Sequence, residues 1–149
     1  MSKRVAIGCD PNASDLKDYI KSCLDEWGYE YTDMGSEDPI YANVAFKVGE
    51  AVARGEYDRG ILLCGTGIGV SIAANKVPGI YAALCTDVYS AERAVKSNNA
   101  NVMTMGAQTI GPIIAREMVK TYLQADWEPG TRSEPKVQAY VDYAKKHEA

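Results

Sequence analysis

Short apolar runs alternate with longer segments of helical spacing along almost the whole chain. Apolar runs bounded by turn residues are typical of strands, whereas apolar positions that recur every third or fourth residue are typical of helices. On this basis we predict about five strands, at residues 4–10, 29–34, in a run that ends at Cys64, at 80–85 and at 101–105. Strands that alternate with helices favour an α/β fold with a parallel sheet.

Helices are predicted between the strands, with ends marked by capping and breaking residues. Ser14 or Asp15 is a candidate N-cap for a helix that runs to Trp27, and Gly28 follows it as a stop. The later helices are expected at about 41–54, from a glycine-rich turn through Asn75, from Asp87 or Ser90 to about 97, at 111–123 and at 135–147.

Residues 1–149 are accordingly expected to form a single domain with a Rossmann-like three-layer fold, a parallel sheet of about five strands and an extra C-terminal helix. A chain of this length can bury a substantial core. The C-terminal helix is mostly polar, but it carries Val137, Tyr140, Val141 and Tyr143. These side chains require a covering surface, which a neighbouring subunit could provide.

The charge and the cysteines narrow the possible functions. The net charge is −4 with no basic block, which argues against binding to nucleic acid or to an acidic membrane surface. No apolar run is long enough to span a bilayer, and the first residues lack the features of a signal peptide. Cys9, Cys23, Cys64 and Cys85 show neither CxxC pairs nor zinc-ligand spacing. We therefore expect free thiols, no bound metal and a cytoplasmic location.

The strongest chemical signal is the segment Ile61–Ser71, in which an apolar strand ends in Cys64 and a glycine-rich turn follows at once. Ligands bind at the carboxyl ends of the strands in open parallel sheets. Glycines let the backbone approach a ligand closely, and the N–H groups of such a loop favour negative charge. The loop is therefore expected to hold a phosphate or an oxyanion that forms during a reaction, and the neighbouring thiol favours the oxyanion.

Four sequence blocks fall in the order and spacing of one enzyme family. They are Gly8-Cys9-Asp10, Cys64-Gly65-Thr66-Gly67-Ile68-Gly69, Ala73-Ala74-Asn75-Lys76-Val77-Pro78-Gly79 and Asn98-Asn99-Ala100-Asn101-Val102. On these blocks nearly the whole chain resembles the type B ribose-5-phosphate isomerases and the related galactose-6-phosphate isomerase subunits. A glycine-rich motif alone is a weak signal, and a dinucleotide-binding fold would place it after the first strand rather than the third.

The resemblance implies an aldose–ketose isomerase that acts on a small phosphorylated sugar. In this family a base removes the proton beside the carbonyl, a cis-enediolate forms, and the proton returns to the neighbouring carbon. The resemblance implies that neither a metal nor an organic cofactor is needed. It also implies a homodimer or homotetramer whose active sites are shared between two subunits, so that a monomer is expected to be inactive.

The resemblance further assigns roles to individual residues. Cys64 matches the general base, and Thr66 beside it is a second catalytic candidate. The backbone expected to stabilise the enediolate oxygen belongs to Gly65, Gly67, Gly69, Val70 and Ser71. Residues that match the sugar-pocket positions are Asp10, Tyr41 and Asn98. Residues that match the two basic phosphate-binding positions are Arg132 and Lys136.

Each of these assignments has a structural alternative. Cys64 could be a buried residue at a strand end, as cysteines in apolar runs usually are. Asp10 could cap the next helix, and Thr66 or Ser71 could cap the helix after the loop. The remaining matched residues could serve ordinary packing or lie on a solvated surface.

The chain departs from the family pattern where histidines and arginines are expected. Pro11 and Ser97 stand where the family commonly has histidine, and Gln108 and Tyr81 where it often has arginine. The only histidine, His147, lies near the C-terminus. The histidine absent at Ser97 is the one to which the family assigns the opening of the sugar ring.

A four-carbon substrate would make that histidine unnecessary. Ribose 5-phosphate exists mainly as a furanose, and its ring must open before the proton on C2 can be removed. In a tetrose 4-phosphate, O4 carries the phosphate and closure through O3 would give a four-membered ring, so no ring has to open. We therefore expect D-erythrose 4-phosphate and D-erythrulose 4-phosphate, or a close stereoisomer, to be the substrate pair.

Three alternatives stay open on the sequence. The chain could be a ribose-5-phosphate isomerase in which Ser97 or Thr66 opens the ring. It could be the catalytic subunit of an isomerase of galactose or allose 6-phosphate. It could also be a phosphate-binding module without catalysis, since a fold does not imply a function. A binding module has no use for a polarised thiol, so the reactivity of Cys64 distinguishes it from an enzyme.

Overall fold

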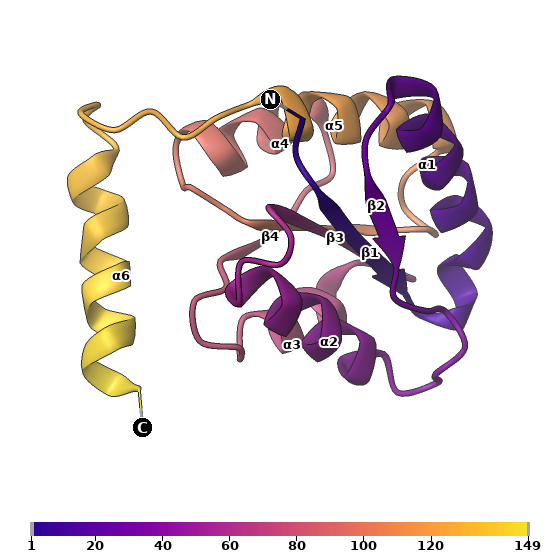
Figure 1. The fold of residues 1–149 in the computed structure, drawn as a ribbon, viewed down its shortest axis with the longest axis horizontal. Coiled ribbons are helices and arrows are strands. Elements are labelled where there is room, and N and C mark those ends of the chain that lie inside the picture. Colours follow the sequence, from indigo (N-terminus) through magenta and orange to yellow (C-terminus); the bar gives the residue numbers. More distant parts are fainter. Residues whose placement is uncertain (1, 149) are drawn as a thin grey trace.

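The computed structural model describes residues 2–148 and contains one parallel sheet of five strands with helices on both faces (Figure 1). The strands are β1 (Val5–Cys9), β2 (Tyr31–Asp33), β3 (Arg59–Cys64), β4 (Ala82–Leu84) and β5 (Val102–Gly106). Their order across the sheet is β2-β1-β3-β5-β4, and all pairings are parallel. The predicted α/β class and number of strands are confirmed, although the edge strands β2 and β4 are shorter than predicted.

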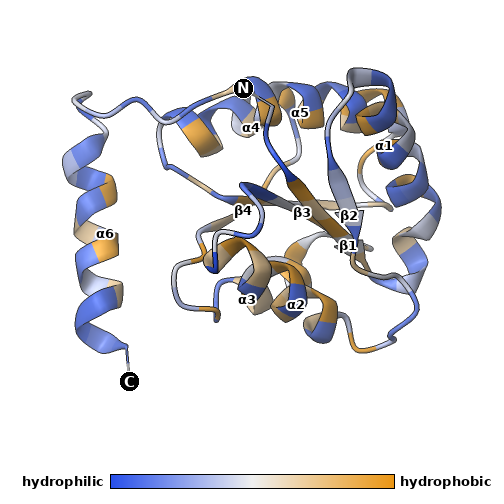
Figure 2. Ribbon diagram, in the orientation of Figure 1, coloured by the Kyte–Doolittle hydropathy of each residue, from blue (hydrophilic) through white to orange (hydrophobic). Residues whose placement is uncertain are grey.

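Helices cover both faces of the sheet because strand side chains point alternately to opposite faces. The helices are α1 (Ser14–Trp27), α2 (Tyr41–Ala53), α3 (Ile68–Ala74), α4 (Val88–Lys96), α5 (Pro112–Gln124) and α6 (Glu134–His147), with a short 3-10 helix, η1 (Pro11–Ala13). Ile7 and Ile61 face the core beneath α1, α4 and α5, whereas Ala6 and Leu62 face the core beneath α2 and α3. Figure 2 shows apolar residues on the sheet and on the helix faces that meet it. The predicted three-layer arrangement is confirmed.

The start of α1 differs from the prediction. The chain first forms η1, in which the Asn12 N–H donates to the Asp10 carboxylate over 3.0 Å. Pro11 suits the first position of such a turn because the N–H it lacks would have no partner there. Neither Ser14 nor Asp15 caps α1, which continues directly from η1, so the predicted N-cap was wrong.

Two asparagine side chains hold the backbone at the start of β4. Asn101 donates through Nδ2 to the Gly79 carbonyl over 2.9 Å, and its Oδ1 accepts from the Tyr81 N–H over 2.9 Å. Asn75 likewise exchanges two hydrogen bonds with the Ala82 backbone, at 2.8 and 3.0 Å. Each asparagine belongs to one of the four sequence blocks, and here its side chain replaces bonds that a longer strand would make.

The chain changes its direction of travel across the sheet between β1 and β3. From β1 it moves outward to β2, and then it places β3 on the other side of β1. Such a switch point leaves a crevice at the carboxyl ends of the two strands, where α/β proteins bind ligands. Asp10 follows β1 and Cys64 ends β3, and the Asp10 N–H donates to the Leu63 carbonyl over 2.9 Å. Two of the predicted site residues therefore border this crevice.

Helix α6 lies outside the three layers, at the side of the sheet where β4 forms the edge (Figure 1). Val137 is buried, and the Tyr140 ring meets the Tyr81 ring with centroids 5.3 Å apart. Tyr143, by contrast, is 67% exposed. The chain therefore covers part of the apolar face of α6 itself and leaves the rest open. Within residues 2–148, no helix has both the length and the hydropathy that crossing a membrane requires.

An ion-pair cluster joins α1 to the end of β2. Lys17 Nζ lies 2.7 Å from one carboxylate oxygen of Asp33, and Lys21 Nζ lies 2.8 Å from the other. The Lys17 side chain is only 2% exposed, so its charge requires this partner. Burial opposes ionisation of Asp33, but hydrogen bonds from both lysines and from the Gly35 N–H outweigh it and lower the pKa of Asp33 to about 2.

We predict that Asp33→Asn destabilises the protein at pH 7 by on the order of 2 kcal/mol or more, and by much less at pH 2. The pKa of this carboxyl is lower in the folded chain than in the unfolded chain, where it is about 3.9. Its stabilising effect is therefore present above the unfolded value and is lost as the pH falls through the folded value. Urea unfolding at a series of pH values measures the difference.

The matched control is Asp126→Asn, which removes the ion-pair partner of Lys3 at a side chain that is 74% exposed. Exposed ion pairs contribute little, so its effect should stay below about 1 kcal/mol. A destabilisation by Asp33→Asn that did not change with pH would contradict the prediction.

Candidate active site

The loop after β3 lies in direct contact with the end of β5. A Cβ atom on Gly106 would lie 2.6 Å from the Thr66 backbone, and one on Gly67 would lie 2.7 Å from the Met105 backbone. Gly67 also has a φ of +80°, which side chains other than glycine rarely adopt. The buried Thr104 hydroxyl donates to the Gly67 carbonyl over 2.8 Å. The packing of this loop therefore requires glycine, whatever chemistry the loop performs.

Cys64 ends β3 and belongs to the core beneath α2 and α3. It is 6% exposed, at the base of the glycine-rich loop. The Gly67 N–H donates to its sulfur, with an N···S distance of 3.1 Å. A backbone N–H in this position can donate to a thiolate as well as to a thiol. The Gly67 N–H therefore bonds the Cys64 sulfur directly.

The other cysteines have different surroundings. Burial raises the pKa of Cys9 and that of Cys85 to about 11 each, so both thiols are neutral at pH 7. Cys23 is buried in α1, where its sulfur accepts from Arg116 Nη1 over 3.5 Å. All four cysteines are free, as predicted. Only Cys64 borders a glycine-rich loop.

Thr66 and the first turn of α3 offer several hydrogen-bonding groups beside Cys64. Thr66 is exposed, and its Oγ1 accepts from the Ile68 N–H over 3.2 Å, which leaves its own O–H able to donate. Gly69 and Val70 lie in the first turn of α3, where a helix has no internal acceptors for its N–H groups. The predicted residues that follow the end of β3 in this way are Gly65, Thr66, Gly67, Gly69, Val70 and Ser71.

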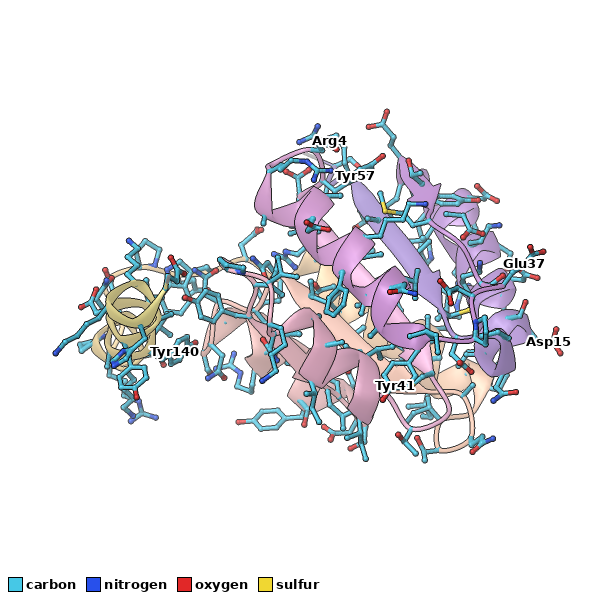
Figure 3. The ribbon with its side chains drawn as sticks, turned by 90° about the horizontal axis from the view of Figure 1, so that it is seen from below. Arg4, Asp15, Glu37, Tyr41, Tyr57 and Tyr140 are labelled. Carbon is cyan, nitrogen blue, oxygen red and sulfur yellow. The ribbon has the colours of Figure 1, made fainter. Side chains whose placement is uncertain are left out.

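Tyr41 and Asp10 border the same region. A Cβ atom on Gly69 would lie 2.3 to 2.5 Å from atoms of the Tyr41 ring and hydroxyl, so the tyrosine packs directly on the glycine. Tyr41 is 40% exposed and lies on the main body of the molecule (Figure 3). Asp10 binds the Asn12 N–H through one carboxylate oxygen, and its other oxygen has no protein donor within residues 2–148. Asp10 thus caps η1, as the structural alternative expected, and still has an acceptor for a ligand.

Asn98, Arg132 and Lys136 lie elsewhere. Asn98 follows α4 and lies near the amino end of β5, whereas Cys64 lies level with the carboxyl end of β5. The strand between these two levels is about 13 Å long. The Tyr140 hydroxyl donates to the Asn98 carbonyl, so α6, with Lys136 in its first turn and Arg132 just before it, is linked to Asn98 rather than to Cys64. Figure 3 shows Tyr41 and Tyr140 well apart. The structure does not bring these three residues to the Cys64 of the same chain.

Sequence reasoning missed Arg93, which reaches Ser97 from one turn earlier in α4. Its Nη1 donates to Ser97 Oγ over 3.2 Å, and its guanidinium lies 6.0 Å from the centroid of the Tyr89 ring. Its Nε is buried and has no hydrogen-bond partner within residues 2–148. The spacing of four residues was a readable signal for this contact. An arginine therefore touches the residue that stands in place of the ring-opening histidine.

The Cys64 crevice is open on its own chain. Large apolar side chains beside the loop are exposed: Ile68 by 51%, Ile72 by 58% and Leu84 by 38%. Exposed apolar patches mark contact surfaces. A separate hollow of about 510 Å³, lined by residues such as Lys17 and Asp33, contains none of the predicted site residues. Residues 2–148 hold no group of three or more His, Cys, Asp or Glu side chains that could bind a metal ion.

The sequence and the fold of the chain are similar to those of known sugar-phosphate isomerases. A family model described as Ribose/Galactose Isomerase matches residues 5–140. The D-erythrulose-4-phosphate isomerase of Pectobacterium atrosepticum is 48% identical over 150 residues, which cover 97% of this chain and 98% of the relative. The ribose-5-P isomerase B of Listeria innocua is 50% identical over 137 residues, which cover 90% and 92%. The solved structure of ribose-5-phosphate isomerase B from Clostridium thermocellum has a TM-score of 0.91 at 40% identity, covering 97% of this chain and 99% of that one.

We predict that Gly106→Ala destabilises the protein by about 1 to 3 kcal/mol, because the added methyl group has no room against the Thr66 backbone. The control is Gly111→Ala, since nothing lies within 4 Å of a Cβ atom at that position. Its effect should be smaller, below about 1 kcal/mol, because alanine at Gly111 meets no atom and only replaces glycine as the N-cap of α5. Thermal or denaturant unfolding measures both variants. Equal stability of the two would show that the loop can move away from β5 without cost.

Proposed function

Since the chain belongs to the ribose/galactose isomerase family and is a sugar-phosphate isomerase, we propose that it interconverts D-erythrose 4-phosphate and D-erythrulose 4-phosphate. The observation that carries this choice is the contact between Arg93 and Ser97, at the position where the family has its ring-opening histidine. The relative from Pectobacterium atrosepticum, whose name gives this activity, supports the same substrate.

A four-carbon sugar phosphate suits a site that has no acid–base group at residue 97. The guanidinium of Arg93 offers N–H donors and no acceptor, so it cannot take a proton from a sugar hydroxyl. The Ser97 hydroxyl is a hydrogen-bonding group with no titration near neutral pH. A furanose would therefore remain closed at this position, whereas a tetrose 4-phosphate is already open.

We propose that Cys64, as a thiolate, removes the proton from C2 of the aldose. The C–H electron pair forms a C1–C2 double bond, and the carbonyl electrons move to O1, which gives a cis-enediolate. The N–H groups of Gly69 and Val70 would stabilise the charge on O1. A proton then passes from O2 to O1, the carbonyl forms at C2, and the thiol returns its proton to C1. The ketose is released and the thiolate is regenerated, with no net oxidation or reduction.

Three residues near Cys64 would bind the rest of the substrate. The Thr66 hydroxyl can donate to a substrate oxygen, because its contact with the Ile68 N–H uses it only as an acceptor. The unpartnered carboxylate oxygen of Asp10 can accept from a sugar hydroxyl. The exposed part of the Tyr41 ring would form one wall of the pocket.

We propose that two copies of the chain share each active site. Cys64 lies at the carboxyl ends of the strands, whereas Asn98 lies at their amino ends, with Arg132 and Lys136 linked to it. One chain therefore cannot bring these three residues to its own sulfur. A second copy would cover the exposed Ile68 beside Cys64 and supply the phosphate-binding cations. A homodimer is the smallest assembly that completes the site, and a homotetramer would contain two such pairs.

We further propose one isomerase domain over residues 1–149 in a cytoplasmic protein. The family model spans most of this range, from residue 5 to residue 140. The four free thiols are consistent with a reducing compartment.

The substrate is tested by measuring isomerisation of erythrose 4-phosphate, ribose 5-phosphate, allose 6-phosphate and galactose 6-phosphate. We expect strong turnover of the tetrose only, and we expect Cys64→Ala to lower its kcat by about 10²- to 10⁴-fold, as loss of a general base does. Cys23→Ala removes a buried thiol far from the loop and should keep the wild-type kcat. The converse variant, Ser97→His, should raise the turnover of ribose 5-phosphate, because imidazole can exchange protons near neutral pH.

Comparable turnover of ribose 5-phosphate by the wild type would contradict the proposed substrate and keep the activity class. Turnover of none of the four sugars, together with slow alkylation of Cys64 that sugar phosphates do not affect, would favour a phosphate-binding module.

Mixed oligomers test the shared site. Cys64→Ala chains and Arg132→Ala/Lys136→Met chains should each have little activity alone at low substrate concentration. A dimer with one chain of each kind keeps one site in which the cysteine and both basic residues are intact. Refolding equal amounts together should therefore restore about a quarter of the wild-type activity. If each site lay within one chain, the mixture would be no more active than the separate variants.

A further inference from the structure

On the proposed isomerase function, we propose that Tyr140 is a positioning residue. It joins the Asn98 loop, which follows α4, to α6 and to the basic residues Arg132 and Lys136 just before and at the start of that helix, so that the two segments act as one substrate-binding unit. These segments are far apart in the sequence, and the hydroxyl of Tyr140 bonds them directly. Tyr140 lies on α6, away from the main body that carries Tyr41 (Figure 3).

The bond reaches the backbone of Asn98 and leaves its side chain available. Tyr140 donates its hydroxyl to the Asn98 carbonyl. The next residue, Asn99, has a φ of +52°, in the left-handed region that few non-glycine residues adopt. An acceptor fixed just before this unusual backbone conformation limits the ways in which the loop can move. The Asn98 amide is thereby presented in one orientation toward a ligand.

The ring of Tyr140 is held from the other side by Tyr81. Their ring centroids lie 5.3 Å apart, with the planes inclined at 44°. The backbone of Tyr81 is itself fixed by Asn101. The Asn101 side chain accepts from the Tyr81 N–H over 2.9 Å, and the Asn101 backbone N–H donates to the Tyr81 carbonyl over 3.1 Å. The position of α6 is therefore fixed, through Tyr140 and Tyr81, relative to Asn101, the residue just before β5.

The same face of α6 carries a basic residue. Lys136 precedes Tyr140 by one helical turn, so their Cβ atoms lie about 6 Å apart. Lys136 and Arg132 are both exposed, and neither forms an ion pair within residues 2–148. Their charges are thus available to an anion. A shift of α6 by a few ångströms would move both cations relative to Asn98, which is why a single hydroxyl can affect phosphate binding.

The test compares Tyr140→Phe with Tyr143→Phe, two substitutions that each remove one hydroxyl from the same helix. Tyr143 is 67% exposed, and its ring stacks on His147 rather than on the body of the protein. We expect Tyr140→Phe to raise the KM for erythrose 4-phosphate by about 3- to 10-fold, with kcat changed by less than about 2-fold. Tyr143→Phe should leave both constants unchanged.

A double-mutant cycle separates positioning from a general loss of structure. Lys136→Met should raise KM by itself, and adding Tyr140→Phe should then raise it by less than in the wild type, because one of the two cations that the hydroxyl places is already gone. Should Tyr140→Phe fail to fold, Tyr81→Leu removes the ring contact alone and is expected to raise KM in the same way. The binding of inorganic phosphate, measured by calorimetry, should weaken in parallel with KM.

Two results distinguish failure of this inference from failure of the proposed function. An active wild type with the same KM and the same phosphate affinity in Tyr140→Phe would overturn the positioning role and keep the isomerase. A wild type that neither turns over the tetrose nor binds phosphate would overturn both. Full additivity of Tyr140→Phe and Lys136→Met would show that the tyrosine acts independently of the basic residues.

Discussion

The rest of the structure depends on the close approach of the loop after β3 to the end of β5. Neither Gly67 nor Gly106 has space for a side chain. The backbone of β5 fills the space beside Gly67, and the backbone of the loop fills the space beside Gly106. This approach places the Gly67 N–H 3.1 Å from the Cys64 sulfur and allows the Thr104 hydroxyl to bond the Gly67 carbonyl. The same lack of a side chain at Gly69 admits the ring of Tyr41. Backbone groups of this loop thus lie directly beside the buried thiol.

Strand topology explains why Cys64 and Asn98 lie far apart within one chain. In a parallel sheet every helix returns the chain from the carboxyl edge to the amino edge. Residues that end a strand, such as Cys64, therefore collect at one edge, and residues that end a helix, such as Asn98, collect at the other. No side chain spans the length of β5 that separates them. A second copy, docked on the exposed apolar side chains beside the loop, is the arrangement that would bring the two edges together.

Hydrogen bonds from a few side chains to the backbone fix the segments around Asn98 and α6, near the amino ends of the strands. Asn75 and Asn101 hold the chain before β4, Tyr81 supports Tyr140, and Tyr140 binds the Asn98 carbonyl. This route leaves the Asn98 amide and the side chains of Arg132 and Lys136 available to a ligand. Next to it, Arg93 holds the Ser97 hydroxyl. A site assembled in this way has no group that opens a sugar ring, and it would therefore select a substrate that is already open.

Local pattern alone was enough to predict the alternating strands and helices, the stop at Gly28 and the glycine-rich turn after Cys64, because apolar periodicity and glycine conformation depend on neighbouring residues. It failed at Ser14, where the Asp10–Asn12 bond starts a 3-10 helix first. It also left Asn75 and Asn101 without a role, since their partners lie just before β4 or at its first residue. The contacts of Tyr41 with Gly69 and of Tyr140 with Asn98 join residues that are distant in the sequence. Strand order decides such contacts, and strand order is a property of the whole sheet that no local pattern contains.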